Sequence, residues 1–286
     1  MLRLRGKPTT GYGKPEVRPN PDINVDVNVR NPGHFFACCG LLETASRIWP
    51  DSEGWFGITG RRSTFYTATK SGHIDPLGEI VRRISEPGTV EETDAEYYDA
   101  GLRPLILLPF DLRLDWWIKN GVNKKSSLKL WAGRQTPLGI MIDMQTELQQ
   151  INPDQNLFTQ DRPMSGRFGI DAASSWNPRG LGFSPDEQNI PWATYPATEI
   201  FAAIGLQRCR PLPVEGMRGR RFVYHIWTCP LEISVLPASA IAGKGEIADK
   251  YQFEVKMRNN QYGSFDWGQS LTMEEATEEE DELPAG

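Results

Sequence analysis

The segment from Ile23 to Pro50 most constrains the fold, because an alternating strand pattern runs directly into a capped helix pattern. Residues 23–30, INVDVNVR, alternate apolar and polar side chains, which predicts a half-buried strand. Asn31 and Pro32 are residue types favoured at the N-cap and at the first position of a helix. Apolar residues then recur at helical spacing until Pro50, which is expected to end the helix. The strand and the helix are therefore expected to share one core.

The elements that follow predict an antiparallel sheet. Segments 54–60 and 61–68, GWFGITG and RRSTFYTA, are rich in aromatic and β-branched residues and predict a hairpin. A second helix is expected from Pro76. The order strand, helix, strand, strand, helix is typical of the opening of a ferredoxin-like unit, the class that includes RNA-recognition-motif (RRM) domains.

Residues 102–118 predict a long strand that Pro109 interrupts. Alternation places Trp116 on the core face and Trp117 on the more exposed face. Trp116 shares its face with Leu112, Leu114 and Ile118, whereas Trp117 shares its face with Asp111, Arg113 and Asp115. The two tryptophans are therefore expected to have different roles.

The rest of the chain predicts further elements of one α+β domain spanning residues 22–271. The expected elements are a helix over 136–151, a strand near 166–176, a helix over 196–206, and strands over 220–229 and 251–257. The predicted fold class is an antiparallel sheet with helices, with an RRM-like or ferredoxin-like core and long insertions.

Two acidic segments conceal a basic remainder. The net charge is -6, but residues 272–286 carry seven acids and no base, and residues 86–99 carry six acids and no base. The remaining chain carries +7. Residues 272–286 are expected to form a disordered acidic tail, and residues 86–101 an acidic loop.

The basic residues concentrate in three places. Residues 1–21 are expected to form an extended basic arm. Residues 119–135 form a second cluster, and a third contains Arg208, Arg210, Arg218, Arg220 and Arg221. A single basic cluster is usually a solvated surface, but three together favour a polyanionic partner.

Residues 119–135 are interpreted as a flexible basic finger that grips phosphates. Its basic side chains are Lys119, Lys124, Lys125, Lys129 and Arg134. Trp117 and Trp131 flank them as candidate stacking platforms for bases. The alternative is an exposed hairpin connection whose Trp131 packs on the core, and for Trp131 this alternative is slightly favoured.

Catalytic patterns are few. The three histidines, His34, His73 and His225, lack metal-ligand spacing, and each is interpreted as structural. Cys38 and Cys39 lie in an apolar helix without a neighbouring base, which disfavours a nucleophile. The sequence predicts no enzyme, no metal site and no cofactor.

The compartment follows from the cysteines and from hydropathy. The four cysteines fit reduced thiols better than a disulfide framework. No apolar run approaches the length of a membrane span, and the first residues lack the apolar core of a signal peptide. A cytoplasmic location without membrane contact is expected.

Five blocks of the chain together carry a resemblance to a known family. They are NPGHFFACCGLLETASRIWPDSEGWF, PFDLRLDWW, LKLWAGRQTP, GFSPDEQ and YPATEIFAAIGLQRCRP, in this order. They resemble CRISPR-associated proteins of type I-G (formerly I-U) operons, which are subunits of Cascade-like effector complexes. The resemblance implies an RRM-like backbone or RAMP-type subunit, or a compact version of the large subunit, of an antiviral ribonucleoprotein. Its partners would be guide RNA, target DNA and other effector subunits.

The leading hypothesis is a non-catalytic subunit that holds guide RNA, target DNA or both. Two alternatives stay open: a metal-independent endoribonuclease that processes guide RNA with His34 or His225, and a scaffold that contacts only proteins. The sequence leaves open the position and stoichiometry of the subunit, the strand that it binds and the roles of its two tails.

Overall fold

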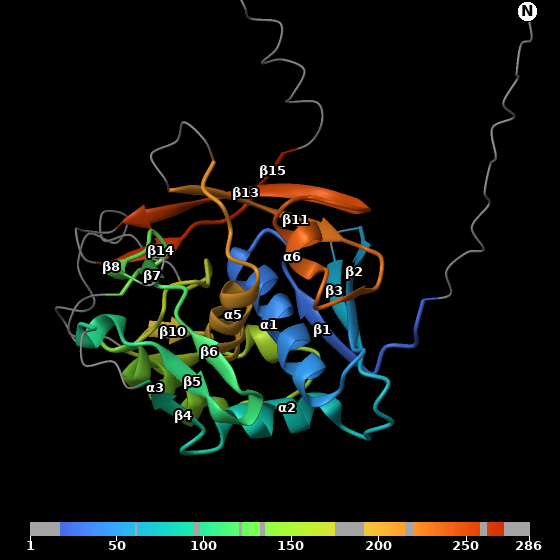
Figure 1. Cartoon of the computed structure of the whole chain (residues 1–286). Helices are drawn as coiled ribbons and strands as arrows, with labels where there is room; N and C mark the ends of the chain where they lie inside the picture. The colour runs from blue at the N-terminus through green and yellow to red at the C-terminus, as the bar shows by residue number, and fades with distance from the viewer. Residues whose placement is uncertain are drawn as a thin grey trace, which may run out of the picture.

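The computed structural model describes residues 18–60, 62–93, 98–119, 122–131, 135–174, 192–214, 220–257 and 262–271. Most of the predicted basic arm, the whole acidic tail, Arg134 and Arg218 lie outside these residues. Within them, the fold is mixed α+β with antiparallel sheets, as predicted (Figure 1). No helix of the described part of the chain is both long and apolar enough to span a membrane.

The first sheet contains the elements predicted at the start of the chain. Strand β1 (Ile23–Val27) pairs with β3 (Arg62–Ala68), which pairs in turn with β2 (Glu53–Thr59), all antiparallel. The short strand β12 (Leu231–Glu232) extends the sheet beside β2. Helix α1 (Pro32–Ile48) connects β1 to β2, and β3 lies between them, as in the opening of a ferredoxin-like unit.

The chain departs from the ferredoxin-like strand order after helix α2 (Pro76–Ser85). Strand β4 (Val90–Glu92), which lies within the predicted acidic loop, does not pair with β1. It forms a separate sheet with β5 (Leu105–Leu107) and β6 (Leu112–Leu114). The predicted interruption at Pro109 is confirmed, because a 3₁₀ turn at Leu108–Phe110 separates β5 from β6. The prediction that one strand continues from 102 to 118 is wrong, because β5 and β6 are antiparallel neighbours and β6 ends at Leu114. The RRM-like identity of the core stays a prediction.

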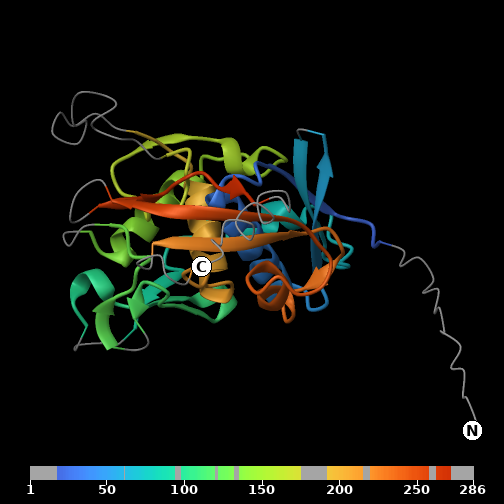
Figure 2. The same cartoon turned by 90° about the horizontal axis from the view of Figure 1, so that it is seen from above.

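A third sheet covers the core from the other side. Strands β11 (Arg221–Trp227) and β13 (Ile247–Met257) confirm the two predicted C-terminal strands, and they pair antiparallel. Strands β14 (Gly263–Phe265) and β15 (Gln269–Ser270) both add to the free edge of β13. Figure 2 looks down on this sheet, with α1 and α5 beneath it. Its inner aromatic residues pack on α1, as shown by the rings of Phe35 and Tyr224, whose centroids are 4.4 Å apart.

Within the described residues, the remaining elements are three helices, two 3₁₀ turns and four short strands. They are η1 (Ala100–Leu102), β7 (Ile118–Lys119), β8 (Val122–Lys125), α3 (Pro137–Leu148), η3 (Leu157–Thr159), β9 (Arg162–Met164), β10 (Trp192–Thr194), α5 (Pro196–Arg208) and α6 (Leu236–Ala240). The helices predicted from Pro137 and Pro196 are confirmed. The predicted strand near 166–176 is wrong as far as residue 174, where the described chain is irregular.

Helices α1 and α5 form the centre of the molecule (Figure 1). Residues 32–45 of α1 and 196–206 of α5 are buried throughout. The two helices approach closely because each carries a glycine at the contact. A Cβ atom on Gly40 would lie 1.9 Å from the carbonyl oxygen of Phe201, and one on Gly205 would lie 1.9 Å from that of Phe36. Neither position has room for a side chain.

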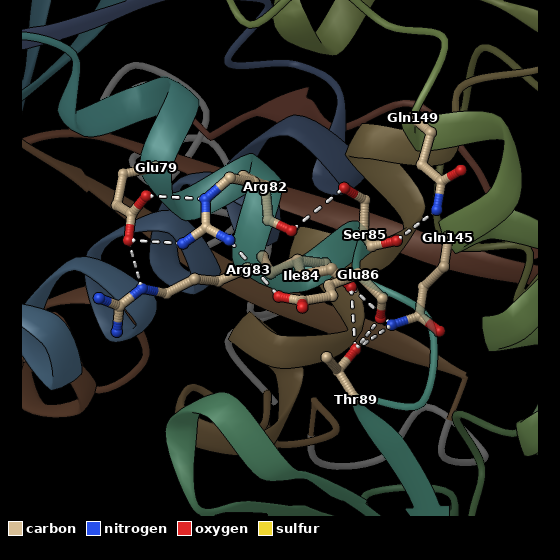
Figure 3. Close-up of polar contacts among 9 residues, drawn as sticks. All are labelled: Glu79, Arg82, Arg83, Ile84, Ser85, Glu86, Thr89, Gln145 and Gln149. Atoms are coloured by element: carbon tan, nitrogen blue, oxygen red, sulfur yellow. Dashed lines mark hydrogen bonds and ion pairs between the residues drawn. The ribbon is translucent and has the colours of Figure 1, made fainter.

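Polar contacts tie α2 to α3 (Figure 3). The Gln145 amide donates to the carbonyl oxygen of Ile84 at 2.5 Å, and the Gln149 amide donates to that of Ser85 at 2.7 Å. These carbonyls belong to the last turn of α2, where no helical amide can reach them. Side chains of α3 therefore cap the end of α2.

At the start of α2, Glu79 accepts hydrogen bonds from Arg82 and Arg83, which lower its pKa to about 2.

Candidate nucleic-acid interface

The first half of the predicted finger is a β-hairpin rather than a flexible loop. Strands β7 and β8 pair antiparallel, and the hairpin is closed at its base by a hydrogen bond from Ser126 N to Trp117 O at 2.8 Å. Asn120 and Gly121 lie between the two strands in the sequence and are a strong hairpin signal, which agrees with the alternative interpretation of an exposed hairpin connection.

The hairpin presents lysines to solvent. The side chains of Lys119, Lys124 and Lys125 are exposed. Within the described residues, no carboxylate forms an ion pair with any of the three. These three positive charges are therefore open to an external anion.

Lys129 is held by its own protein, and its predicted role as a free phosphate contact does not fit the structure. Its ammonium nitrogen donates to the carbonyl oxygen of Trp131 at 2.8 Å and lies 4.6 Å from the centroid of the Trp131 ring. Burial, and to a smaller extent Lys125, lower the pKa of Lys129 to about 8. Lys129 therefore stabilises the end of the finger instead of extending from it.

The predicted exposure of Trp117 is wrong. Its side chain is 0% exposed, and its indole nitrogen donates to the carbonyl oxygen of Leu102 at 3.2 Å. The alternation used for the prediction ends at Leu114, and a turn follows in which Ile118 N donates to Asp115 O at 2.8 Å. In a turn, neighbouring side chains need not point to opposite faces, so both tryptophans face inward.

Trp131 also belongs to the core, as the alternative interpretation proposed. It is 3% exposed and contacts Trp116, Trp117 and Phe168, with ring centroids 5.4–5.8 Å away. The predicted burial of Trp116 is confirmed. In this fold, neither Trp117 nor Trp131 presents a face on which a base could stack.

The third basic cluster is largely used inside the protein. Arg208 forms a bidentate pair with Glu43 of α1, with nitrogen–oxygen distances of 2.7 and 3.0 Å. Arg210 pairs with Asp115 at 3.5 Å, and Arg221 lies 3.9 Å from Glu254. Arg220 is exposed and has no ion pair within the described residues.

Glu43 is a buried carboxylate that binds two arginines, a contact that sequence reasoning missed. It accepts hydrogen bonds from Arg208 and, at 2.7 Å, from Arg47. Arg47 also donates to the carbonyl oxygens of Phe110 and Asp111. Burial raises the pKa of Glu43, but the hydrogen bonds from Arg208 and Arg47 outweigh burial and lower it below its ordinary value. A lone acid in an apolar helix was the available sequence signal.

A second buried acidic cluster connects the starts of α1 and α5. Glu199 accepts hydrogen bonds from the backbone amides of Gly169 and Asp171, both at 2.9 Å. The Asp171 carboxylate accepts from the Asn31 amide at 2.5 Å and from the Ser174 hydroxyl at 2.7 Å. Burial raises the pKa of Glu199 to about 7, helped by the negative charge of Asp171. The carboxylates of Glu199 and Asp171 both accept hydrogen bonds from neighbouring donors, and these bonds hold segment 169–174 in place.

The histidines named as alternative catalysts occupy interior or half-buried positions. Nδ1 of His34 accepts a hydrogen bond from the backbone amide of Asn28 at 3.1 Å, and burial lowers the pKa of His34. His225 is half-buried, pairs in the sheet with Lys250 and also has a pKa lowered by burial. Within the described residues, no group of three or more potential ligands could hold a metal ion.

Comparisons with models of protein families, with curated proteins and with solved structures found no match to this chain.

Proposed function

We propose that this chain is a non-catalytic nucleic-acid-binding protein whose β7–β8 hairpin contacts the phosphate backbone. The observation that carries the proposal is the set of three exposed lysines, Lys119, Lys124 and Lys125, that have no ion pair within the described residues. Lysine side chains on a short hairpin can contact successive phosphates without reading a base sequence. Arg220 is a further exposed cation of the same kind.

The resemblance of five sequence blocks supports a more specific proposal. The protein would be a subunit of a type I-G CRISPR effector complex, with an RRM-like core, holding guide RNA or target DNA in antiviral defence in the cytoplasm. Such a subunit must hold a strand of any sequence, and exposed lysines meet that requirement. Co-purification of the chain with an RNA and with the proteins of the same operon tests the assignment.

Replacing Lys119, Lys124 and Lys125 with alanine tests the proposed contact. Each phosphate contact to a single strand contributes about 0.7 to the slope of log affinity against log salt, so the slope should flatten by about 2. The measurement is fluorescence anisotropy with a labelled single-stranded RNA over a range of salt concentrations. Unrelated sequences should lose a similar amount of affinity.

A charge-matched variant controls for net charge. Arg62, Lys70 and Lys244 are exposed cations outside the hairpin, and replacing them with alanine removes the same formal charge. Lys70 is ion-paired with Glu53 at 2.9 Å, so the control changes net charge without removing three open cations. The control should leave the slope close to that of the wild type. Equal slopes for both variants and the wild type would contradict the role of the hairpin.

Incubation with repeat RNA distinguishes the alternatives: cleavage lost in His34→Ala or His225→Ala indicates an endoribonuclease, and no RNA retention indicates a scaffold.

A further inference from the structure

Trp267 is an exposed aromatic side chain, whereas the predicted stacking residues Trp117 and Trp131 are buried. It is 41% exposed, and among the tryptophan side chains that the structure describes it is the sole exposed one. An exposed indole keeps apolar surface in contact with water, and removing that surface from water would be favourable. A single exposed apolar residue is common on proteins, so the surroundings of Trp267 decide its meaning.

A bulge in the third sheet places Trp267 at the surface. Gln252 pairs with Gln269 and Val255 pairs with Phe265. Two residues of β13 thus lie opposite three residues of the other strand, Asp266, Trp267 and Gly268. Bulges re-aim side chains and often lie beside functional sites. Trp267 occupies the middle of this bulge.

Arg30 lies directly beside the bulge. The amide of Gly268 donates to the carbonyl oxygen of Arg30 at 2.6 Å, and Nε of Arg30 donates to the carbonyl oxygen of Gly268 at 3.4 Å. These contacts fix the arginine next to Trp267 and leave its terminal nitrogens for another acceptor. Arg30 is exposed, and within the described residues it has no ion pair. An exposed cation is therefore held at the residue that directly follows the exposed ring in the chain.

The carboxylates nearby already have partners. Asp266 is paired with Lys256 at 2.5 Å. Asp249 accepts hydrogen bonds from the Tyr251 and Ser270 hydroxyls at 2.9 and 3.1 Å. Arg30 therefore adds positive charge that neither of these acids takes up as an ion pair.

Strand β14 connects the bulge to Leu130, which follows the last residue of the basic hairpin by five positions. Gly263 N donates to the carbonyl oxygen of Leu130 at 2.8 Å, and Trp267 follows Gly263 by four residues. An extended chain of that length spans about 14 Å. On the β11 side of β13, the backbone amide of Val255 donates to the carbonyl oxygen of Arg220 at 2.8 Å. Figure 1 shows β7, β8 and β14 together at one end of β13. The segment that carries the hairpin and the bulge therefore adjoin the same strand, β14.

We propose that Trp267 and Arg30 form a base-stacking site for single-stranded nucleic acid: Trp267 stacks on a base, and Arg30 binds the adjoining phosphate. The inference rests on the proposed function and adds the aromatic platform that the lysine hairpin lacks. Grooves that bind single strands combine such cations and rings. Tryptophan and arginine are also frequent in protein–protein hot spots, but open lysines on the connected hairpin favour a polyanion.

Affinity measurements with two matched strands test the site. The strands are a mixed-sequence single-stranded RNA and an abasic sugar–phosphate strand of the same length. Trp267→Ala should weaken binding of the RNA by roughly 5- to 150-fold and leave binding of the abasic strand unchanged. Trp267→Phe should retain most of the affinity. Quenching of tryptophan fluorescence by the RNA should be smaller in Trp267→Phe than in the wild type.

The lysine variant separates this inference from the proposed function. Wild-type binding that depends on Lys119, Lys124 and Lys125 but is unchanged in Trp267→Ala would overturn the stacking site and keep the proposed function. No binding of the RNA by the wild type would overturn both. Loss of a co-purifying protein in Trp267→Ala, with RNA affinity intact, would assign the site to a protein partner and overturn the inference. Unchanged thermal unfolding of Trp267→Ala confirms that its fold is intact.

Discussion

At the scale of single residues, Glu199 links stability to pH. Its pKa is raised by burial to about 7 from an ordinary value of 4.5. Between these values Glu199 binds more protons in the folded protein than in the unfolded chain, so its contribution to the free energy of unfolding should fall as pH rises. One pKa unit corresponds to about 1.4 kcal/mol, so this residue should contribute a loss of roughly 3 kcal/mol across the window. Urea unfolding from pH 5 to pH 8 measures it.

Glu199→Gln removes the titrating group. As pH rises over the same window, the wild type should lose stability relative to the variant by roughly 3 kcal/mol. The variant should also be less stable at pH 5 by about 1–3 kcal/mol, because an amide cannot accept hydrogen bonds from both Gly169 and Asp171. Glu43 contributes outside this window, because its pKa is lowered and its contribution is lost only as pH falls below its ordinary value of 4.5. His34 and His225 have pKa values lowered from 6.5 and so lose stability as pH falls, but they do so in both proteins and cancel in the difference. An identical pH dependence in both proteins would contradict the assignment.

At the scale of elements, the crossing of α1 and α5 depends on two glycines. Gly40→Ala or Gly205→Ala would place a methyl group 1.9 Å from a backbone oxygen of the other helix. A backbone oxygen cannot move aside as a flexible side chain can, so the helices must separate. Each variant should lose about 1–3 kcal/mol of unfolding free energy or more. Thermal or urea unfolding at constant pH measures the loss.

Gly139 of α3 provides the control for this prediction. It is exposed, and the nearest neighbour of an added Cβ is the Thr136 hydroxyl at 3.1 Å. Alanine is favoured over glycine within helices by about 1 kcal/mol, so Gly139→Ala should be neutral or stabilising. Equal effects at Gly139 and Gly205 would show that helix propensity, and not the crossing, determines the result.

Local rules predicted the elements well and their surroundings poorly. The starts of α1, α3 and α5 follow from a proline at the first turn, together with the cap residues Asn31 and Thr136 in the first two helices. The burial of Trp117 could not be predicted, because it depends on Leu102 and Phe168, which other segments bring to it. Likewise, only the packing of α1 against α5 brings Glu43 to Arg208. Exposure and pairing of charges are properties of tertiary structure.

At the scale of the whole molecule, the charges of the chain are separated by sign along the sequence. Residues 272–286 carry seven acids and no base, and they follow β15, which lies close in the sequence to Trp267. An acidic segment can compete with phosphate for basic surfaces. Deleting residues 272–286 should therefore tighten binding of random single strands, most strongly at low salt, where screening is weak. Salt titrations of the truncated and full chains measure the effect; equal affinities at every salt concentration would contradict it.

The tryptophan cluster also determines how the hairpin is presented. Trp117 precedes β7 and Trp131 follows β8, and their ring centroids lie 5.6 Å apart in the core. Both ends of the segment that carries Lys119, Lys124 and Lys125 are thus anchored before any ligand arrives. A free loop would lose conformational entropy on binding, at about 1–2 kcal/mol for each backbone residue fixed. Here much of that ordering is already achieved on folding, so the lysines meet a strand as a preorganised surface.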